Sequence, residues 1–186
     1  DDLPKGVNPG DIRVKDTDGN GSITADDRKN IGQGGQPKFR WGLNNTFRYK
    51  NFTLSFFLNA MQGWKGSFSL ANGGTPSRSL NFVDMGWWTP ENKSQTRPSL
   101  THTNQYNISW YYSRDFIRIQ DVSLSYDVPR SFLNKINLNS LRLFISGKNL
   151  YTFTDWPGVD PETGTNTYET SYPMPRTITI GANISF

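Results

Sequence analysis

Strict alternation of apolar and polar residues is the dominant pattern of this chain, and it is clearest over residues 177–186. Every second residue there is apolar, and the residues between them are polar or small. A β-strand points successive side chains to opposite faces, so this alternation predicts a strand with one apolar and one polar face. The apolar set is Ile178, Ile180, Ala182, Ile184 and Phe186.

Four earlier segments repeat the pattern. Residues 39–49 alternate aromatic or aliphatic side chains with basic or polar ones, and a tight turn at 50–51 leads into a second strand over 52–61. A third strand is expected over 115–127 and a fourth over about 140–152. These lengths suit the ~9–11 residues with which a tilted β-strand crosses a bilayer.

The third strand changes phase within its length. Ile117 and Ile119 occupy odd positions, whereas Val122 and Leu124 occupy even ones. The apolar residues can stay on one face if this strand contains one residue more than its partner strand. The sequence therefore predicts either a β-bulge or a strand that rises out of a membrane.

The connections fall into two classes. The turns at 50–51 and 128–139 are short, and the second has room for one helical turn over 131–136. The long connections lie at 1–37, 63–114 and 153–172, with a short strand expected at 12–15. If the strands alternate in direction, the short and long connections lie at opposite ends. Short periplasmic turns and long external loops are the rule in transmembrane β-barrels.

We therefore expect an all-β fold: strands of a large antiparallel transmembrane β-barrel, in which residues 38–186 form the wall. Five strands cannot close a barrel and lipid does not tolerate an open edge, so the chain is expected to be a piece of a larger protein. The residues expected to face lipid are Phe52, Leu54, Phe56, Leu58, Leu143, Ile145, Ile178, Ile180 and Ile184. Those expected to face the lumen are Arg40, Arg48, Thr53, Ser55, Asn59, Arg142, Lys148, Thr179 and Asn183.

Composition narrows the choice of function. The chain has 186 residues, of which 34% are hydrophobic and 14% aromatic, which suits strands with one wet face. No window reaches the ~18 apolar residues of a transmembrane helix. There is no cysteine, which excludes disulfides and thiolate metal sites. The net charge of +4 comes from scattered residues, so nucleic acid is not an expected partner. The chain starts at Asp1 without a leader, so we expect a processed protein or a fragment.

Seven stretches resemble the C-terminal part of the SusC/RagA family of TonB-dependent outer-membrane transporters, and they occur in the family's order. They are 9–13 (PGDIR), 16–23 (DTDGNGSI), 37–39 (PKF), 88–92 (WTPEN), 116–126 (FIRIQDVSLSY), 146–150 (SGKNL) and 172–176 (YPMPR). The spacing of Gly181, Ile184 and Phe186 also resembles the C-terminal assembly signal of bacterial outer-membrane proteins.

The resemblance implies a 22-stranded, plugged barrel in the outer membrane of a Gram-negative bacterium. It implies import of glycans or peptides with a SusD-like surface lipoprotein as partner. The TonB complex would supply energy through a region that lies at the N-terminus in this family and outside this chain. The alternative is a soluble, calcium-stabilised β-sandwich that binds glycans. Its strands would be shorter, since average strands in globular proteins have ~5–6 residues.

A candidate calcium loop lies within the first external loop, at residues 16–27. It offers oxygen ligands at positions 1, 3 and 5, glycine at position 6, and a carboxylate at position 12, as the EF-hand template requires. Position 12 is Asp where EF-hands have Glu, which shortens the last ligand. The expected ligands are Asp16, Asp18, Asn20, the Ser22 carbonyl, Thr24 and Asp27. The alternative is a polar Asx turn without metal.

The remaining candidates are aromatic. Tryptophans in the expected loops could pack those loops or form an interfacial belt, contact a lipoprotein lid, or stack on sugar. The residues considered for substrate or lid contact are Trp64, Trp87, Trp88 and Trp156. His102 is the only histidine, and no nucleophile–base or carboxylate pair stands out, so an enzyme is not expected.

Overall fold

A computed structural model describes residues 7–30, 34–68, 86–99, 110–164 and 174–186. The chain divides into two compact units. The loop unit comprises residues 1–34 and 66–112, and the sheet unit comprises residues 35–65 and 113–186. No helix in the described ranges has the length and apolar character needed to cross a membrane.

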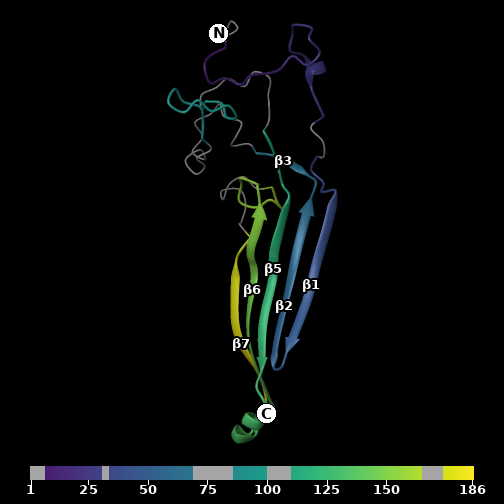
Figure 1. Cartoon of the computed structure of the whole chain (residues 1–186), viewed down its shortest axis with the longest axis vertical. Coiled ribbons are helices and arrows are strands. Elements are labelled where there is room, and N and C mark those ends of the chain that lie inside the picture. The colour runs from purple at the N-terminus through teal and green to yellow at the C-terminus, as the bar shows by residue number, and fades with distance from the viewer. Residues whose placement is uncertain (1–6, 31–33, 69–85, 100–109, 165–173) are drawn as a thin grey trace. The chain divides into compact units, whose positions relative to one another are not determined.

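The sheet unit is a five-stranded antiparallel meander of order β1-β2-β5-β6-β7, and Figure 1 shows its strands side by side. The strands are β1 (Phe39–Tyr49), β2 (Phe52–Gln62), β5 (Phe116–Asp127), β6 (Ser140–Thr154) and β7 (Thr177–Ser185). All five predicted strands are thereby confirmed, and β6 continues to Thr154, beyond the expected end at 152.

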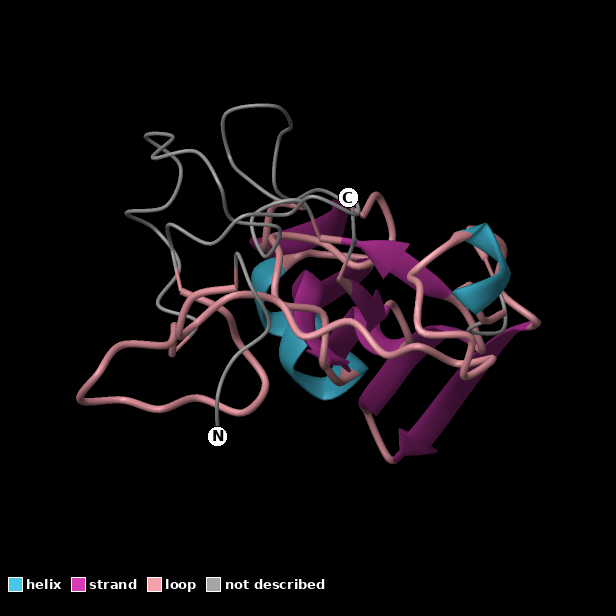
Figure 2. Cartoon of the chain, turned by 90° about the horizontal axis from the view of Figure 1, so that it is seen from above, coloured by secondary structure: helices cyan, strands magenta, loops and turns pink. Residues whose placement is uncertain are grey.

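Two short strands, β3 (Lys65–Ser67) and β4 (Tyr111–Ser113), were not predicted; they pair with each other. The strand expected at 12–15 is wrong, because these residues adopt no regular structure. Four alternating residues are too few to hold a strand unless a partner supplies a ladder. The helical segments among the described residues are single turns (Figure 2): η1 (Ala25–Asp27), α1 (Arg130–Leu133) and η4 (Asn134–Ile136).

The short turns close the strands as predicted. Tyr49 pairs with Phe52, which leaves two turn residues, and Lys50 takes the left-handed φ of 52°. Asn51 is tied to the end of β5 in both directions: its side-chain amide donates to the Asp127 carbonyl at 2.9 Å, and its own carbonyl accepts from the Asp127 amide at 2.9 Å. These hydrogen bonds join the turn between β1 and β2 to β5 at this end of the sheet.

The second turn contains the predicted helical turn. Leu133 of α1 is buried, and its carbonyl accepts from the Leu138 amide at 3.2 Å. Asn137 takes a φ of 52°, which reverses the chain after η4. The Asn139 amide then donates to the Ser185 carbonyl at 2.9 Å, so the turn also holds the last strand.

A bulge at Gln120 explains the phase change in β5. Phe57 of β2 pairs with Asp121 and Leu58 pairs with Ile119, so Gln120 has no partner in the register. The extra residue turns Ile119 onto the same face as Val122. The bulge was one of the two alternatives predicted from the alternation, and it is confirmed.

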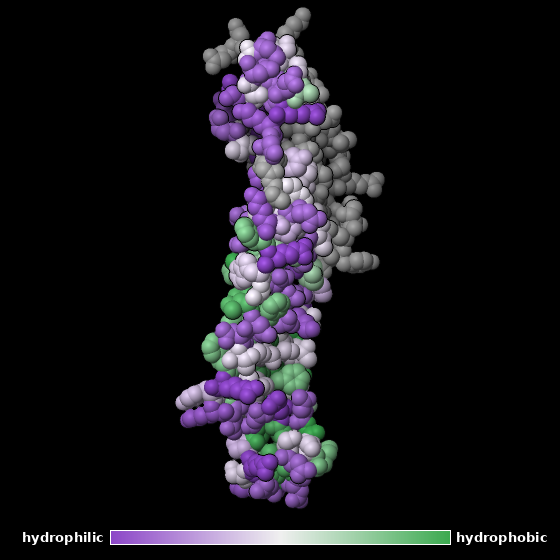
Figure 3. Space-filling model, turned by 90° about the vertical axis from the view of Figure 1, so that its right-hand side faces the viewer, coloured by the Kyte–Doolittle hydropathy of each residue, from purple (hydrophilic) through white to green (hydrophobic). Residues whose placement is uncertain are grey.

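The register gathers one apolar face across all five strands. Phe52 pairs with Tyr126, Tyr126 with Leu143, and Leu143 with Ala182, and the other apolar positions follow the same rows. Many of these side chains are exposed, up to 78% at Ile180, whereas Phe56, Leu58 and Val122 are half-buried and Ala60 is buried. Apolar side chains are visible along the surface of the sheet in Figure 3. All residues predicted to face lipid lie on this face, and all those predicted to face the lumen lie on the other, polar face.

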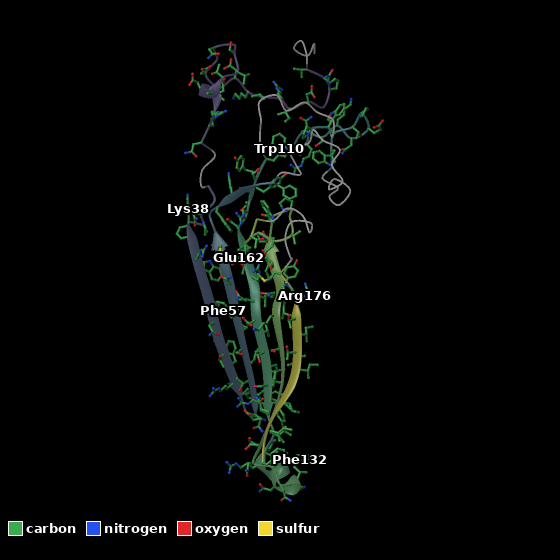
Figure 4. All side chains as sticks on the ribbon, turned by 180° about the vertical axis from the view of Figure 1, so that it is seen from behind. Lys38, Phe57, Trp110, Phe132, Glu162 and Arg176 are labelled. Atoms are coloured by element: carbon green, nitrogen blue, oxygen red, sulfur yellow. The ribbon has the colours of Figure 1, made fainter. Side chains whose placement is uncertain are left out.

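Two glycines on the polar face lie beneath aromatic rings. A Cβ on Gly42 would lie 2.8 Å from Phe57 Cε2, and a Cβ on Gly181 would lie 2.5 Å from Phe144 Cζ. Phe57, labelled in Figure 4, comes from the middle of β2. These rings cover backbone that would otherwise lack a neighbouring side chain.

We expect Gly181→Ala to destabilise the sheet by about 1–3 kcal/mol, because the added methyl group forces Phe144 out of its position. The measurement is the thermal unfolding midpoint of the receptor that contains this chain. Phe144→Leu combined with Gly181→Ala should recover much of the loss. An unchanged midpoint for Gly181→Ala alone would contradict the packing described here.

Candidate metal loop and a charged cluster on the sheet

The first half of the candidate metal loop is organised by two carboxylates. Asp16 accepts from the Gly19 amide at 2.7 Å with one oxygen and from the Gly21 amide at 2.8 Å with the other. Asp18 accepts from the Asn20 amide at 3.0 Å. Gly19 and Gly21 have φ values of 75° and 82°, which favour glycine. The chain therefore curls around Asp16.

The second half closes on Asp27. Its Oδ1 accepts from the Thr17 amide at 2.6 Å, and its Oδ2 accepts from the Thr24 amide at 2.8 Å. Thr24 in turn accepts from the Asp26 amide, so that Thr24 and Asp27 form a capping box around η1. Asp27 is buried, which is unusual for a carboxylate and is balanced here by these hydrogen bonds.

The structure brings three of the predicted ligands together. One carboxylate oxygen each from Asp16, Asp18 and Asp27 lies within 4.8 Å of the others. Ca²⁺–oxygen distances are 2.3–2.6 Å, so ligands across one ion lie up to about 5 Å apart, and this spacing fits the ion. Asn20 Oδ1 accepts from the Ser22 amide at 2.8 Å. The local turns of the metal-free alternative are thus present as well.

The tryptophans mostly serve packing. Trp64, Trp87 and Trp156 are each at most 9% exposed, which leaves their rings little surface for a substrate. Trp88 is half-buried, with its ring against Gly10, where a Cβ would lie 2.6 Å from Trp88 Cε3. Contact between these residues and a substrate or lid stays a prediction. His102 lies outside the described residues.

The residues of the assembly signal lie on or beside β7. Gly181 lies under Phe144, Ile184 pairs with Leu141, and Phe186 is 87% exposed. Their role in assembly stays a prediction.

A buried charged cluster on the sheet was not predicted. Arg118 of β5 is 2% exposed, and each of its three guanidinium nitrogens donates a hydrogen bond. It donates to Asp160 at 2.8 Å, to Glu162 at 2.7 Å and to the Thr152 hydroxyl at 3.0 Å. Glu162 lies beside the ends of the long strands in Figure 4. The only signal in the sequence is a lone arginine in a strand and two acids about forty residues later, which does not specify a pair.

Arg114 forms the second half of this cluster. Its Nε donates to the Pro161 carbonyl and its Nη2 to the Glu162 carbonyl, both at 2.7 Å. The guanidinium lies 3.8 Å from the centre of the Trp64 ring, and the Trp64 indole donates to the Arg114 carbonyl at 2.8 Å. Burial lowers the pKa of Arg114, while Asp160 raises it. The side chain remains charged at neutral pH, because an arginine guanidinium is not deprotonated in proteins.

The metal loop should lose order on acidification. Backbone hydrogen bonds from Gly21 and Gly19 lower the pKa of Asp16 below its ordinary 3.8, and those from Thr24 and Thr17 lower the pKa of Asp27 in the same way. A carboxyl group whose pKa is lower in the folded loop than in the unfolded chain stabilises the folded loop at any pH above the unfolded-chain pKa of 3.8. This stabilisation is lost as the pH falls from 3.8 through the lower pKa of the folded loop. The measurement is the protection of the amides of residues 16–27 against hydrogen exchange above and below pH 3.8, corrected for the intrinsic exchange rate.

Asp27→Asn is the control for the acid effect. It should lower protection at neutral pH and flatten the pH dependence, because a titrating acceptor is gone. Equal protection of the wild-type loop across the range would contradict the expectation.

Three curated relatives match nearly the whole chain. It is 36% identical to TonB-dependent receptor P3 of Formosa agariphila over 192 residues, which cover 96% of this chain and 19% of the receptor. It is 30% identical to TonB-dependent receptor P26 of the same organism over 200 residues, covering 95% of this chain and 20% of that receptor. TonB-dependent receptor P39 matches at 30% over 196 residues. The chain thus spans about a fifth of the length of these relatives. Comparison with family models finds no match.

Solved structures show the same fold. A structure of the RagAB peptide importer in the open-open state superposes with a TM-score of 0.67 at 22% identity, covering 89% of this chain and 19% of that chain. A structure of the RagAB peptide transporter gives 0.62 at 24% identity, covering 81% of this chain and 17% of that chain. With the motifs quoted above, these matches show that the chain belongs to the SusC/RagA family of TonB-dependent receptors, as a C-terminal part of such a receptor.

Proposed function

We propose that this chain forms C-terminal wall strands of an outer-membrane β-barrel that imports peptides or glycans. The observation that carries the proposal is the continuous, exposed apolar face of the five-stranded sheet. Side chains such as Ile178, Ile180 and Ile184 are more than half exposed although they lie in regular strands. An apolar face of this extent needs a cover, and lipid hydrocarbon supplies one without a second sheet.

The polar face supports the same function. It presents Arg48, Thr53, Ser123 and Asn183 along neighbouring strands, which suits a hydrated barrel interior. The soluble β-sandwich alternative would need a second large sheet over the apolar face. The described residues contain only the short β3–β4 pair besides the main sheet.

The proposed import also requires barrel strands outside this chain and partner proteins. In the proposal, β1 and β7 pair with strands outside this chain to close a barrel of the 22-stranded, plugged type in a Gram-negative outer membrane. The TonB complex drives uptake, and a SusD-like surface lipoprotein assists it. The RagAB structures are described as a peptide importer, which favours peptides over glycans as the substrate class.

A membrane-embedded quencher tests the barrel. Single cysteines carrying a fluorophore at Leu54, Ile145 and Ile180 should be quenched by brominated lipid in reconstituted receptor, because these positions face hydrocarbon. Matched labels at Ser55, Ser146 and Thr179, one residue away in each strand, should be quenched far less. Equal quenching of the two sets would contradict a lipid-facing sheet. Weak quenching of the first set would also contradict it, because a second sheet in a β-sandwich would shield these positions from lipid.

We propose further that residues 16–27 bind calcium in a structural role. The support is the gathering of Asp16, Asp18 and Asp27 and the two left-handed glycines that bend the chain. Asn20, the Ser22 carbonyl and Thr24 complete the proposed oxygen set. Asp at position 12 is short, so we expect weak binding, in the roughly 10⁻⁴–10⁻³ M range of extracellular modules.

Calcium titration of the receptor tests this site, with terbium luminescence as a second readout. Asp18→Asn should weaken binding at least about tenfold, because one formal charge is lost from the cluster while the side chain keeps its shape. Asp26→Asn is the matched control, since Asp26 belongs to the same loop but not to the ligand set. Equal affinities of the two variants, or no saturable binding by the wild type, would contradict the site.

A further inference from the structure

Residues 155–164, which follow β6, fold back onto the polar face of the sheet, and we call them the inward loop. The direction is set by Arg118. Its register partners Asn59 and Thr152 place its side chain on the polar face, and Asp160 and Glu162 of the loop reach it there. The loop therefore covers the side opposite the exposed apolar face.

One of the two ion pairs of the inward loop, Arg118–Asp160, is desolvated. The side chains of Arg118 and Asp160 are each 3% exposed. Removing one member of such a pair leaves an uncompensated buried charge, which is strongly destabilising. A second ion pair on the same face, Arg142–Asp127, provides a contrast: its side chains are 53% and 47% exposed. Exposed pairs contribute little.

Contacts between Arg114 and the loop backbone add to the ion pairs. Arg114 binds two successive loop carbonyls, and its guanidinium also lies against Gly164, where a Cβ would be 2.7 Å from Arg114 Cζ. Trp156 is buried at the start of the loop. The Arg114 guanidinium lies 5.9 Å from the centre of the Trp156 ring. The loop is thus anchored at both ends and in the middle.

We propose that the inward loop is a fixed constriction that sets the size limit of the substrate passage, with Arg118 as its positioning residue. The inference rests on the proposed function, in which the polar face lines the barrel interior. A loop tethered by the desolvated Arg118–Asp160 pair, by the Arg118–Glu162 pair and by backbone carbonyls does not swing aside like a hinged lid. It permanently occupies cross-section that the passage would otherwise have. Glu162, 32% exposed, leaves part of a carboxylate at the surface of the constriction.

Size-dependent labelling of the complete receptor in intact cells tests the proposal. Ser146 is replaced by cysteine, because it lies on the polar face of β6, between Ser123 and Thr179 in the register. Maleimide conjugates of polyethylene glycol of increasing mass are added from outside. We expect the wild-type loop to admit N-ethylmaleimide and to exclude conjugates above a threshold. Asp160→Asn should raise the labelling rate of the smallest excluded conjugate at least about tenfold, because the loop loses its desolvated pair.

Asp127→Asn is the matched control: it makes the same change in an arginine–aspartate pair on the same face, and the threshold should stay unchanged. Glu162→Gln, at a more exposed position, gives a milder second test if Asp160→Asn lowers surface levels, and a smaller shift in the same direction is expected. The proposal is overturned if none of the loop variants shifts the mass threshold for labelling. It is also overturned if Asp127→Asn shifts that threshold as much as Asp160→Asn does. Labelling of Ile180→Cys but not Ser146→Cys by N-ethylmaleimide would instead refute the proposed barrel orientation.

Discussion

Pairing of backbone polar groups along five neighbouring strands is the constraint on which the rest of this structure depends. Each central strand satisfies its amide and carbonyl groups through its two neighbours, which permits a large apolar surface outside the sheet. Many of the side chains on that surface remain exposed, even where rings contact one another, as those of Phe52 and Tyr126 do. Their burial has to come from the surroundings, and a bilayer provides it in the proposed barrel. Strand pairing and the proposed location are thus linked.

Local adjustments keep both faces of the sheet consistent. The bulge at Gln120 lets β5 change phase without bringing Ile117 and Ile119 onto the polar face. Opposite the bulge on β6, Asn149 takes a φ of 51°, and Leu150 packs where a Cβ on Gly147 would lie 2.6 Å away. Here β6 has one residue more than β5, because Ile119 pairs with Tyr151 and Asp121 pairs with Lys148.

The two charged sites differ in how the chain builds them. The metal loop is made of contacts between residues at most ten positions apart, and its carboxylates are satisfied by nearby amides. The cluster around Arg118 joins residues 34 to 44 positions apart, and its Arg118–Asp160 pair is excluded from water. The first site can form whenever its own segment is ordered. The second exists only when β5, β6 and the inward loop are all in place.

The sequence by itself determined the five long strands, the phase change in the third of them and the two short turns, because a period of two and local turn preferences are properties of neighbouring residues. It also determined the gathering of Asp16, Asp18 and Asp27, since the glycines at 19 and 21 bend the chain locally. It misled at 12–15, where alternation had no partner strand to pair with. The tertiary structure alone decided that Arg118 meets Asp160 and Glu162, and that three tryptophans are buried. Those outcomes depend on which distant segments a fold brings together, and no local pattern of charge or hydrophobicity encodes that choice.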